Sequence, residues 1–190
     1  TDDQGAPRVS AADDGSFLVV WQSLGQAGGL DYDIYTRRFD ASGAAVGSDV
    51  LVNSYTTSDQ GLPAIAAAAN GGFVVVWQSF DQAGGFDYDI YGRRLTATGA
   101  TTGAEFRVNA ATVDDQQSAS VAAASNGTFV VAWQAFGAQT GDDEILARAF
   151  DATASPLAAA KRVNAATDGD QSAPSVAAAP DGTFAVAWQT

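Results

Sequence analysis

The sequence predicts an all-β array of tandem repeats, because one block of about 56 residues recurs along the chain and no segment has a helical period. Three dipeptides recur with this block. They are Asp-Gln near its start, Trp-Gln in its middle and Val-Asn near its end: Asp3-Gln4, Asp59-Gln60, Asp115-Gln116, Asp170-Gln171, Trp21-Gln22, Trp77-Gln78, Trp133-Gln134, Trp188-Gln189, Val52-Asn53, Val108-Asn109 and Val163-Asn164. We therefore divide the chain into units 1–56, 57–112 and 113–167 and a partial unit 168–190, and expect a fragment of a longer protein.

Each unit reads as four short strands separated by turn residues. In the second unit the expected strands are 63–68, 73–78, 89–95 and 105–109. An Asn-Gly or Asp-Gly pair follows the first strand of each unit and predicts a two-residue type I′ hairpin, since both residues of that turn need positive φ. These pairs are Asp14-Gly15, Asn70-Gly71, Asn126-Gly127 and Asp181-Gly182.

The second strand of the unit indicates how the sheets pack. Phe73, Val75 and Trp77 point to one face, and Val74 and Val76 point to the other. A sheet with one face in water alternates apolar and polar residues, so a sheet that is apolar on both faces is expected between two others. With an Ala-rich first strand at a crowded centre, this predicts a β-propeller-like array of four-stranded antiparallel blades. Tandem immunoglobulin-like sandwiches are the alternative, although such a domain needs about 100 residues.

Closure of a ring needs more blades than this chain supplies. Propellers have roughly 4–8 blades, whereas the sequence holds three full units and the first hairpin of a fourth. We therefore expect either further repeats in the parent protein or self-association that completes the array.

Composition excludes several classes of function. The formal net charge of −13 repels phosphate backbones, so nucleic acid is not an expected partner. The sequence contains no His and no Cys, which excludes imidazole and thiolate metal ligands and catalytic triads that use His. No run of 18 apolar residues occurs, so no membrane span is expected.

Four segments carry a resemblance to a known repeat type. They are GSFLVVWQS at 15–23, DYDIYTRRFDASG at 31–43, GGFVVVWQS at 71–79 and DYDIYGRRLTATG at 87–99. The chain resembles, over essentially its whole length, blade repeats that stand in tandem in large secreted or surface bacterial proteins. Those proteins often also carry hemolysin-type calcium-binding repeats, whose nonapeptide is absent here. The resemblance implies an extracellular or cell-surface location and says little about the ligand.

Paired acids at the start of the third strand are the first candidate site. The pairs are Asp31/Asp33, Asp87/Asp89 and Asp142/Glu144. Residues i and i+2 of a strand share a face, so the two carboxylates can converge beside a Gly-rich loop that offers carbonyl oxygens. Because Ca²⁺ prefers six to eight oxygen ligands, one reading is a calcium site in each blade. The other reading is that these acids cap turns or pair with Arg37, Arg93 and Arg148 of the same strand.

Aromatic residues near these acids are candidates for stacking on a sugar. Tyr32, Phe80, Phe86 and Tyr88 lie close to Gly and Asp in expected loops. The four tryptophans share a strand face with Phe and Val, so we expect them in the core instead. The repeated Asp-Gln pairs could bind a ligand or lock neighbouring blades together, and their presence in every unit favours the second role.

These observations lead to a non-enzymatic, extracellular binding or adhesion module, calcium-dependent in one version, with a glycan or protein ligand on a cell or matrix surface. A purely structural spacer or assembly unit is one alternative. A carboxylate-dependent, glycan-active enzyme is the other, and it would need two carboxyls about 5–5.5 or 6.5–9.5 Å apart. No pair is singled out for that role, because the prominent acids are repeated, although the third unit drifts at Asp142-Asp143-Glu144 and at Ala149.

Overall fold

A computed structural model describes residues 3–69, 71–137, 141–165 and 168–190, and within these ranges the chain is all β. The strands are β1 Gln4–Ala11, β2 Phe17–Leu24, β3 Tyr32–Phe39, β4 Ala45–Leu51, β5 Gln60–Ala67, β6 Phe73–Phe80, β7 Tyr88–Leu95, β8 Thr101–Arg107, β9 Gln116–Ala123, β10 Phe129–Phe136, β11 Asp143–Phe150, β12 Lys161–Arg162, β13 Ser172–Ala178 and β14 Phe184–Gln189. The described residues contain no helix with the length and apolarity needed to cross a membrane.

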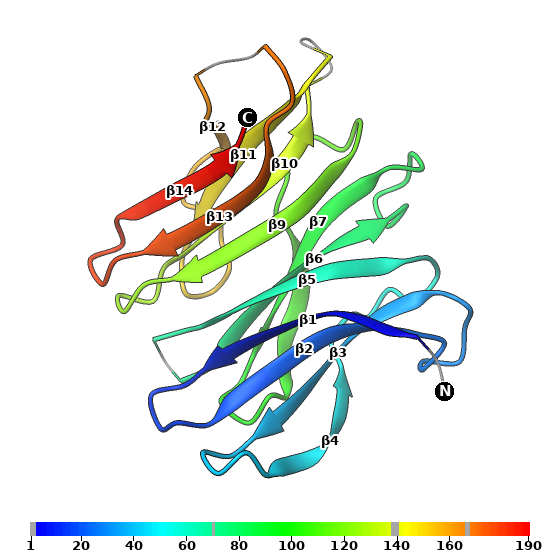
Figure 1. The fold of residues 1–190 in the computed structure, drawn as a ribbon, viewed down its shortest axis with the longest axis vertical. Coiled ribbons are helices and arrows are strands. Elements are labelled where there is room, and N and C mark those ends of the chain that lie inside the picture. The colour runs from blue at the N-terminus through cyan, green and yellow to red at the C-terminus, as the bar shows by residue number, and fades with distance from the viewer. Residues whose placement is uncertain (1–2, 70, 138–140, 166–167) are drawn as a thin grey trace.

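Each repeat unit forms one antiparallel sheet. The first three units give four-stranded sheets in the orders β1-β2-β3-β4, β5-β6-β7-β8 and β9-β10-β11-β12, and the partial unit gives the hairpin β13-β14. Figure 1 shows the sheets following one another along the long axis, with the N-terminus and the C-terminus at opposite ends. The predicted fold class, a β-propeller-like array of four-stranded blades, is confirmed.

The hairpins between the first two strands of a unit differ from the predicted type I′ turns. Ala12 N donates to Ser16 O at 2.8 Å and Gly15 N donates to Ala12 O at 3.0 Å, which encloses three loop residues. Gly15 alone takes a positive φ, of 80°, while the Asp14 carboxylate accepts the Ser16 amide at 2.9 Å. An Asp that bonds forward to its own turn favours a type I turn followed by a Gly bulge. Residue 70 of the Asn70-Gly71 pair lies outside the described residues.

The core consists of apolar layers between successive sheets. Leu18, Val20, Ile34 and Val52 of the first sheet pack against Phe73, Val75, Trp77 and Leu95 of the second. Val74, Val76, Ile90 and Val108 on the rear of the second sheet pack against Phe129, Val131, Trp133 and Phe150 of the third. Trp77 and Trp133 are fully buried, as expected for core residues. Trp21 and Trp188, in the two end sheets, are half-buried.

The inner strands share one irregularity. Ala6, Leu62, Ser118 and Ala173 have positive φ values of 49°, 47°, 53° and 50°, and each lies where the pairing register shifts by a bulge. Each inner strand also contacts the next, from β1 through β5 and β9 to β13. Together they line a cavity of about 390 Å³, so the Ala-rich strands lie at the centre as predicted.

The third and fourth strands of the first two sheets pair residues of complementary size at one position. Gly92 lies opposite Phe106 in the second sheet, and a Cβ at Gly92 would come within 2.6 Å of the Phe106 ring. In the first sheet the corresponding pair is Thr36 and Val50. Phe106 uses this space to reach Phe129 and Phe150 of the next sheet, with ring centroids 5.9 and 5.5 Å away.

Candidate functional site

The repeated dipeptides hold the sheets together. Asp59 accepts the Tyr32 amide of the preceding sheet at 3.0 Å, and Asp115 accepts the Tyr88 amide at 3.0 Å. Gln60 accepts the indole N–H of Trp77 at 3.0 Å, with the same bond at 2.8 Å in the third unit and 2.9 Å in the fourth. The Asp of each pair therefore joins neighbouring blades, which is the role that repetition favoured, while the Gln holds the Trp of its own blade.

The second acid of the first two pairs is buried in a polar network. The Asp33 carboxylate accepts the Asn53 side-chain amide at 2.6 Å, and Asn53 in turn accepts the Ile34 amide at 2.7 Å. Asp89 and Asn109 repeat this arrangement in the second sheet. Burial raises the pKa of Asp33 and of Asp89, against the lowering effect of the Asn donors.

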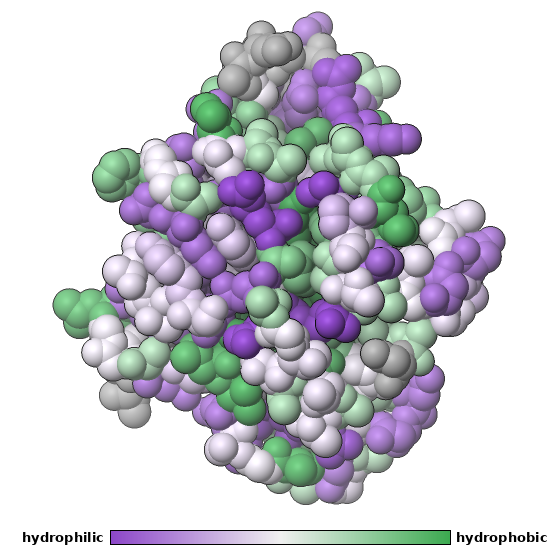
Figure 2. Space-filling model, turned by 180° about the vertical axis from the view of Figure 1, so that it is seen from behind, coloured by the Kyte–Doolittle hydropathy of each residue, from purple (hydrophilic) through white to green (hydrophobic). Residues whose placement is uncertain are grey.

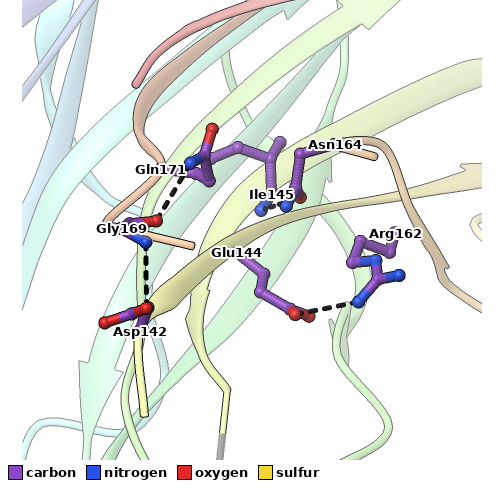
Figure 3. A network of polar contacts seen from close by, with 7 residues as sticks. All are labelled: Asp142, Glu144, Ile145, Arg162, Asn164, Gly169 and Gln171. Atoms are coloured by element: carbon purple, nitrogen blue, oxygen red, sulfur yellow. Dashed lines mark hydrogen bonds and ion pairs between the residues drawn. The ribbon is translucent and has the colours of Figure 1, made fainter. Parts of the chain in front are cut away.

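The third pair departs from this pattern, as Figure 3 shows. Glu144 forms an ion pair with Arg162 at 3.0 Å, and Asp142 accepts the Gly169 amide at 2.9 Å. Among the described residues, no group of three or more His, Cys, Asp or Glu is placed to hold a metal ion. Calcium binding at the three pairs stays a prediction.

The recurrent arginines do not pair with these acids as the alternative reading expected. Arg93 donates to Val52 O of the preceding sheet at 2.8 Å, and Arg148 donates to Val108 O at 2.9 Å. Arg37, in the first sheet, lies 3.6 Å from Asp49. Arg93 and Arg148 therefore reach from the third strand of their own sheet to the preceding sheet, and these two arginines serve packing between sheets.

The predicted stacking aromatics gather at the sheet edge where the second strands end and the third strands begin. Phe80 and Tyr88 contact each other with ring centroids 5.1 Å apart, and burial raises the pKa of Tyr88. Phe86 is 77% exposed in the loop between β6 and β7, and Tyr32 opens β3 at the corresponding place. Their role in sugar stacking stays a prediction.

A cavity of about 390 Å³ between the second and third sheets brings together residues that no single motif contains. Its walls come from the start of β7, the connection from β8 to β9, and the facing parts of β9, β10 and β11. The lining residues are Asp87, Asp114, Asp115, Gln117, Gln134, Phe136 and Asp143. Four carboxylates therefore surround one space, beside two amides and a Phe136 ring that is 42% exposed.

Asp143 breaks the repeat, and Asp114 differs from two of its three counterparts. Asp143 lies opposite Phe136, where the second sheet places Tyr88 opposite Phe80. Asp114 precedes the Asp-Gln pair, where the second and fourth units have Ser58 and Gly169. Its counterpart in the first unit, Asp2, lies outside the described residues. The positive φ of Asp114, 66°, is one that L-residues adopt infrequently, so this carboxylate is carried on a constrained turn.

Gln134 also behaves differently from its counterparts. Gln22 and Gln78 accept amides of the next inner strand, from Leu62 at 2.9 Å and from Ser118 at 3.5 Å. Gln134 donates its side-chain amide to the Asp143 carboxylate at 2.7 Å. The repeat-breaking acid is thus positioned by a residue that elsewhere joins blades.

Of the residues predicted from sequence for a site, Asp87 lines this cavity. Asp143 was noted as a point where the third unit drifts but was not assigned to a site, and Asp114 was not singled out. A position-by-position comparison of the units favours Asp143, where Asp replaces the Tyr of the first two units, but not Asp114, whose counterpart in the first unit is Asp2.

Comparison with known proteins supports the fold. No protein-family model matches the sequence, nor does any curated protein. Among solved structures, an α-L-arabinofuranosidase from Lactobacillus brevis is 12% identical with a TM-score of 0.59, and the match covers 97% of this chain and 64% of that one. An α-L-arabinofuranosidase from Fusarium graminearum is 11% identical with a TM-score of 0.64, covering 93% and 50%. The Hadza microbial sialidase Hz136 is 13% identical with a TM-score of 0.66, covering 91% and 39%.

The chain is thus a β-propeller-type repeat protein, and it spans less than two thirds of the length of each of these three structures. The expectation of a non-enzymatic binding or adhesion module is wrong, because the named structures that share its fold are glycoside hydrolases. The physical reason lies in the cavity. The sequence argument held that all prominent acids are repeated, whereas Asp143 replaces the Tyr of the first two units and lines the cavity.

Proposed function

We propose that this chain is part of a glycan-active β-propeller that hydrolyses glycosidic bonds with carboxylates of the cavity between the second and third sheets. The observation that carries the proposal is that Asp143, which breaks the repeat, and Asp114, which differs from Ser58 and Gly169, line one cavity. A symmetric scaffold needs its repeated residues for folding, so chemistry is expected where the repeat is broken.

The lining residues suit the needs of glycoside hydrolysis. Such reactions use one carboxyl as a general acid and a second as a base or nucleophile on the other side of the scissile bond. Asp143 is positioned by Gln134 and suits the fixed base or nucleophile. Asp114, on its constrained turn in the same cavity, suits the acid that protonates the leaving oxygen.

The remaining lining groups suit recognition of a sugar ring. The half-exposed Phe136 ring offers a face for the apolar side of a sugar, and the Gln117 amide offers a donor and an acceptor for its hydroxyls. Four carboxylates and a net charge of −13 disfavour an anionic sugar. We therefore propose a neutral glycan as the substrate class, which agrees with the arabinofuranosidases and the arabinanase among the structures of this fold.

The test is hydrolysis of a panel of neutral chromogenic glycosides and of arabinan by the 190-residue chain, with Asp114→Asn and Asp143→Asn as variants. We expect each variant to lose activity by about 10²–10⁴-fold while its thermal melt is unchanged. Asp31→Asn is the matched control, because Asp31 occupies the position of Asp87 at the other junction, and it should keep full activity. Absence of hydrolysis by the folded chain, or an equal loss in the control, would overturn the proposal.

Two further expectations from the sequence remain proposals of their own. The first is an extracellular or cell-surface location, which rests on the resemblance to blade repeats of secreted proteins. The second is Ca²⁺ binding at the Asp31/Asp33, Asp87/Asp89 and Asp142/Glu144 pairs. Calorimetric titration with Ca²⁺ tests the second, and heat corresponding to about three ions per chain is the expected result if every pair coordinates one.

A further inference from the structure

The loop between β6 and β7 holds a bulky side chain on a backbone that favours glycine. Phe86 is 77% exposed and has a φ of 62°. A positive φ is an outlier for a bulky residue, and such outliers cluster at catalytic and ligand-binding sites. Exposing a large aromatic ring to water adds a second cost. Folding alone explains neither feature.

The matching loop of the first sheet provides an internal comparison. Both loops read Gln-Ala-Gly-Gly-X-Asp-Tyr-Asp, where X is Leu30 in the first and Phe86 in the second. Gly85 and Phe86 have positive φ values of 110° and 62°, whereas Gly29 and Leu30 do not have positive φ. Nearly identical sequences therefore adopt different backbones, so the conformation of Phe86 depends on the surroundings of the second loop.

Polar contacts fix the second loop in this conformation. Gln82 donates to Glu105 of β8 at 2.8 Å. The Asp81 amide donates to the Asp87 carbonyl at 3.0 Å, and the Asp81 carboxylate accepts the Phe86 amide at 3.3 Å. These contacts hold the backbone of Phe86 in place and present its ring to solvent. Little further ordering is needed when a ligand binds to such a ring.

The second loop borders the cavity between the second and third sheets. Asp87 lines this cavity, and a Cβ at Gly85 would lie 3.8 Å from the Thr112 carbonyl. Val113 is 70% exposed, and Asp114 after it also lines the cavity. Exposed apolar side chains therefore stand directly beside two of the lining acids. Figure 2, turned by 180° from Figure 1, shows apolar side chains projecting from the edge where the loops β2–β3 and β6–β7 lie.

We propose that the cavity acts on a chain of neutral sugar units, with Phe86 as the stacking surface for a unit outside the cavity. This inference rests on the proposed function and deepens it, because it adds chain length to the substrate class. Phe136 offers one ring inside the cavity, and Phe86 at the rim offers a second ring to a further part of the same chain. The loop conformation, which the sequence did not indicate, selects Phe86 among the aromatic candidates.

The experiment measures kcat/KM for 4-nitrophenyl glycosides of arabinose, xylose, galactose and glucose, from single units to hexamers. In the series that is hydrolysed, we expect kcat/KM to rise with chain length. Phe86→Gly should lower kcat/KM on the hexamer by about 3–10-fold, through KM, and leave the rate on single units unchanged. Its melting temperature should stay the same or rise, because Gly accepts the positive φ.

Leu30→Gly is the matched control, since it makes the same change in the loop at the other junction, and it should leave all rates unchanged. An equal loss in this control would overturn the proposal, as would a Phe86→Gly variant that loses rate equally on single units and hexamers. Hydrolysis of single units with no gain from chain length would overturn it too, while leaving the proposed function in place. Absence of hydrolysis at every length would overturn both. A changed sedimentation coefficient of the Phe86→Gly variant would assign the ring to a contact between copies instead.

Discussion

The junction between the first and second sheets and the junction between the second and third have the same framework and different chemistry. Both have an Asp that accepts an amide of the preceding sheet at 3.0 Å, and in both an Arg reaches a Val carbonyl. The second junction replaces Ser58 and Tyr88 by Asp114 and Asp143. The comparison separates residues that assemble blades, which are constant, from residues free to carry a reaction.

The largest effect is expected when the second junction is made like the first. The double change Asp114→Ser and Asp143→Tyr should reduce glycan hydrolysis by about 10²–10⁴-fold, because both proposed reacting carboxyls are removed. Stability should stay the same or rise, since crowded like charges are lost. Initial rates and thermal melts measure the two effects. Ser58→Asp at the first junction is the control and should leave the rate unchanged; a double variant that keeps its activity would contradict the assignment.

The next effect compares Trp77, which is buried between the first and second sheets, with Trp21, which is half-buried in the first sheet. Trp77→Ala should lower the free energy of unfolding by about 3–5 kcal/mol, because a large side chain is removed from a closed core. Trp21→Ala should cost less than about 2 kcal/mol, since Trp21 still faces solvent on one side. Urea denaturation measures the unfolding free energy of both variants. Equal losses of free energy would refute the difference between the two tryptophan sites.

A smaller effect concerns the indole partners of these two tryptophans. Gln60→Ala leaves the buried N–H of Trp77 without an acceptor and should cost about 1–3 kcal/mol. Gln4→Ala should cost close to nothing, because the indole of Trp21 has no hydrogen-bond partner within the described residues. Denaturation midpoints measure both changes, and a large loss in the Gln4 variant would show that Gln4 is engaged in solution.

The smallest effect is a difference in pH dependence between buried and turn carboxylates. Burial raises the pKa of Asp33, so its stability contribution is full below the ordinary Asp value of about 3.9 and is lost as pH rises through the folded value. The Ser42 hydroxyl lowers the pKa of Asp40, so that contribution is present above about 3.9 and is lost as pH falls through the folded value. Asp33→Asn should therefore change the melting temperature more favourably at pH 7 than at pH 3. Asp40→Asn should lower the melting temperature more at pH 7 than at pH 3. Melts at both values decide, and parallel shifts would contradict the assignment.

Much of the fold follows from the sequence, because the repeat length and the apolar residues on both faces of a strand are properties of whole units and whole strands. The alternation of Phe73, Val75 and Trp77 with Val74 and Val76 requires neighbours on both sides, and the structure supplies them for the second sheet. Turn type was not predictable in the same way. The Asp14, Asn126 and Asp181 side chains bond forward to their own loops, so one residue more enters these three hairpins and only the Gly adopts positive φ.

The bulges of the inner strands and the cavity are tertiary features without a local signal. Leu62 and Ser118 have positive φ although neither residue type favours it, and each offers its amide to a Gln of the preceding sheet. Asp87 reaches the cavity from the second sheet and Phe136 from the third, a proximity that only the packing of two sheets creates. Asp143 was within reach of sequence reasoning, since Tyr32 and Tyr88 occupy its position in the first two units, whereas Asp114 shares its residue type with Asp2 of the first unit.

The size pairing of Gly92 with Phe106 has a consequence for how such a gene can change. Tandem copies exchange segments by recombination, and a crossover between the codons of these two positions would separate the partners. One product would join Thr36 to Phe106, where the added side chain meets a ring that already leaves only 2.6 Å for a Cβ. The other would join Gly92 to Val50 and leave a void. Whole-unit exchange avoids both defects, so a viable recombinant inherits its third and fourth strands as one block.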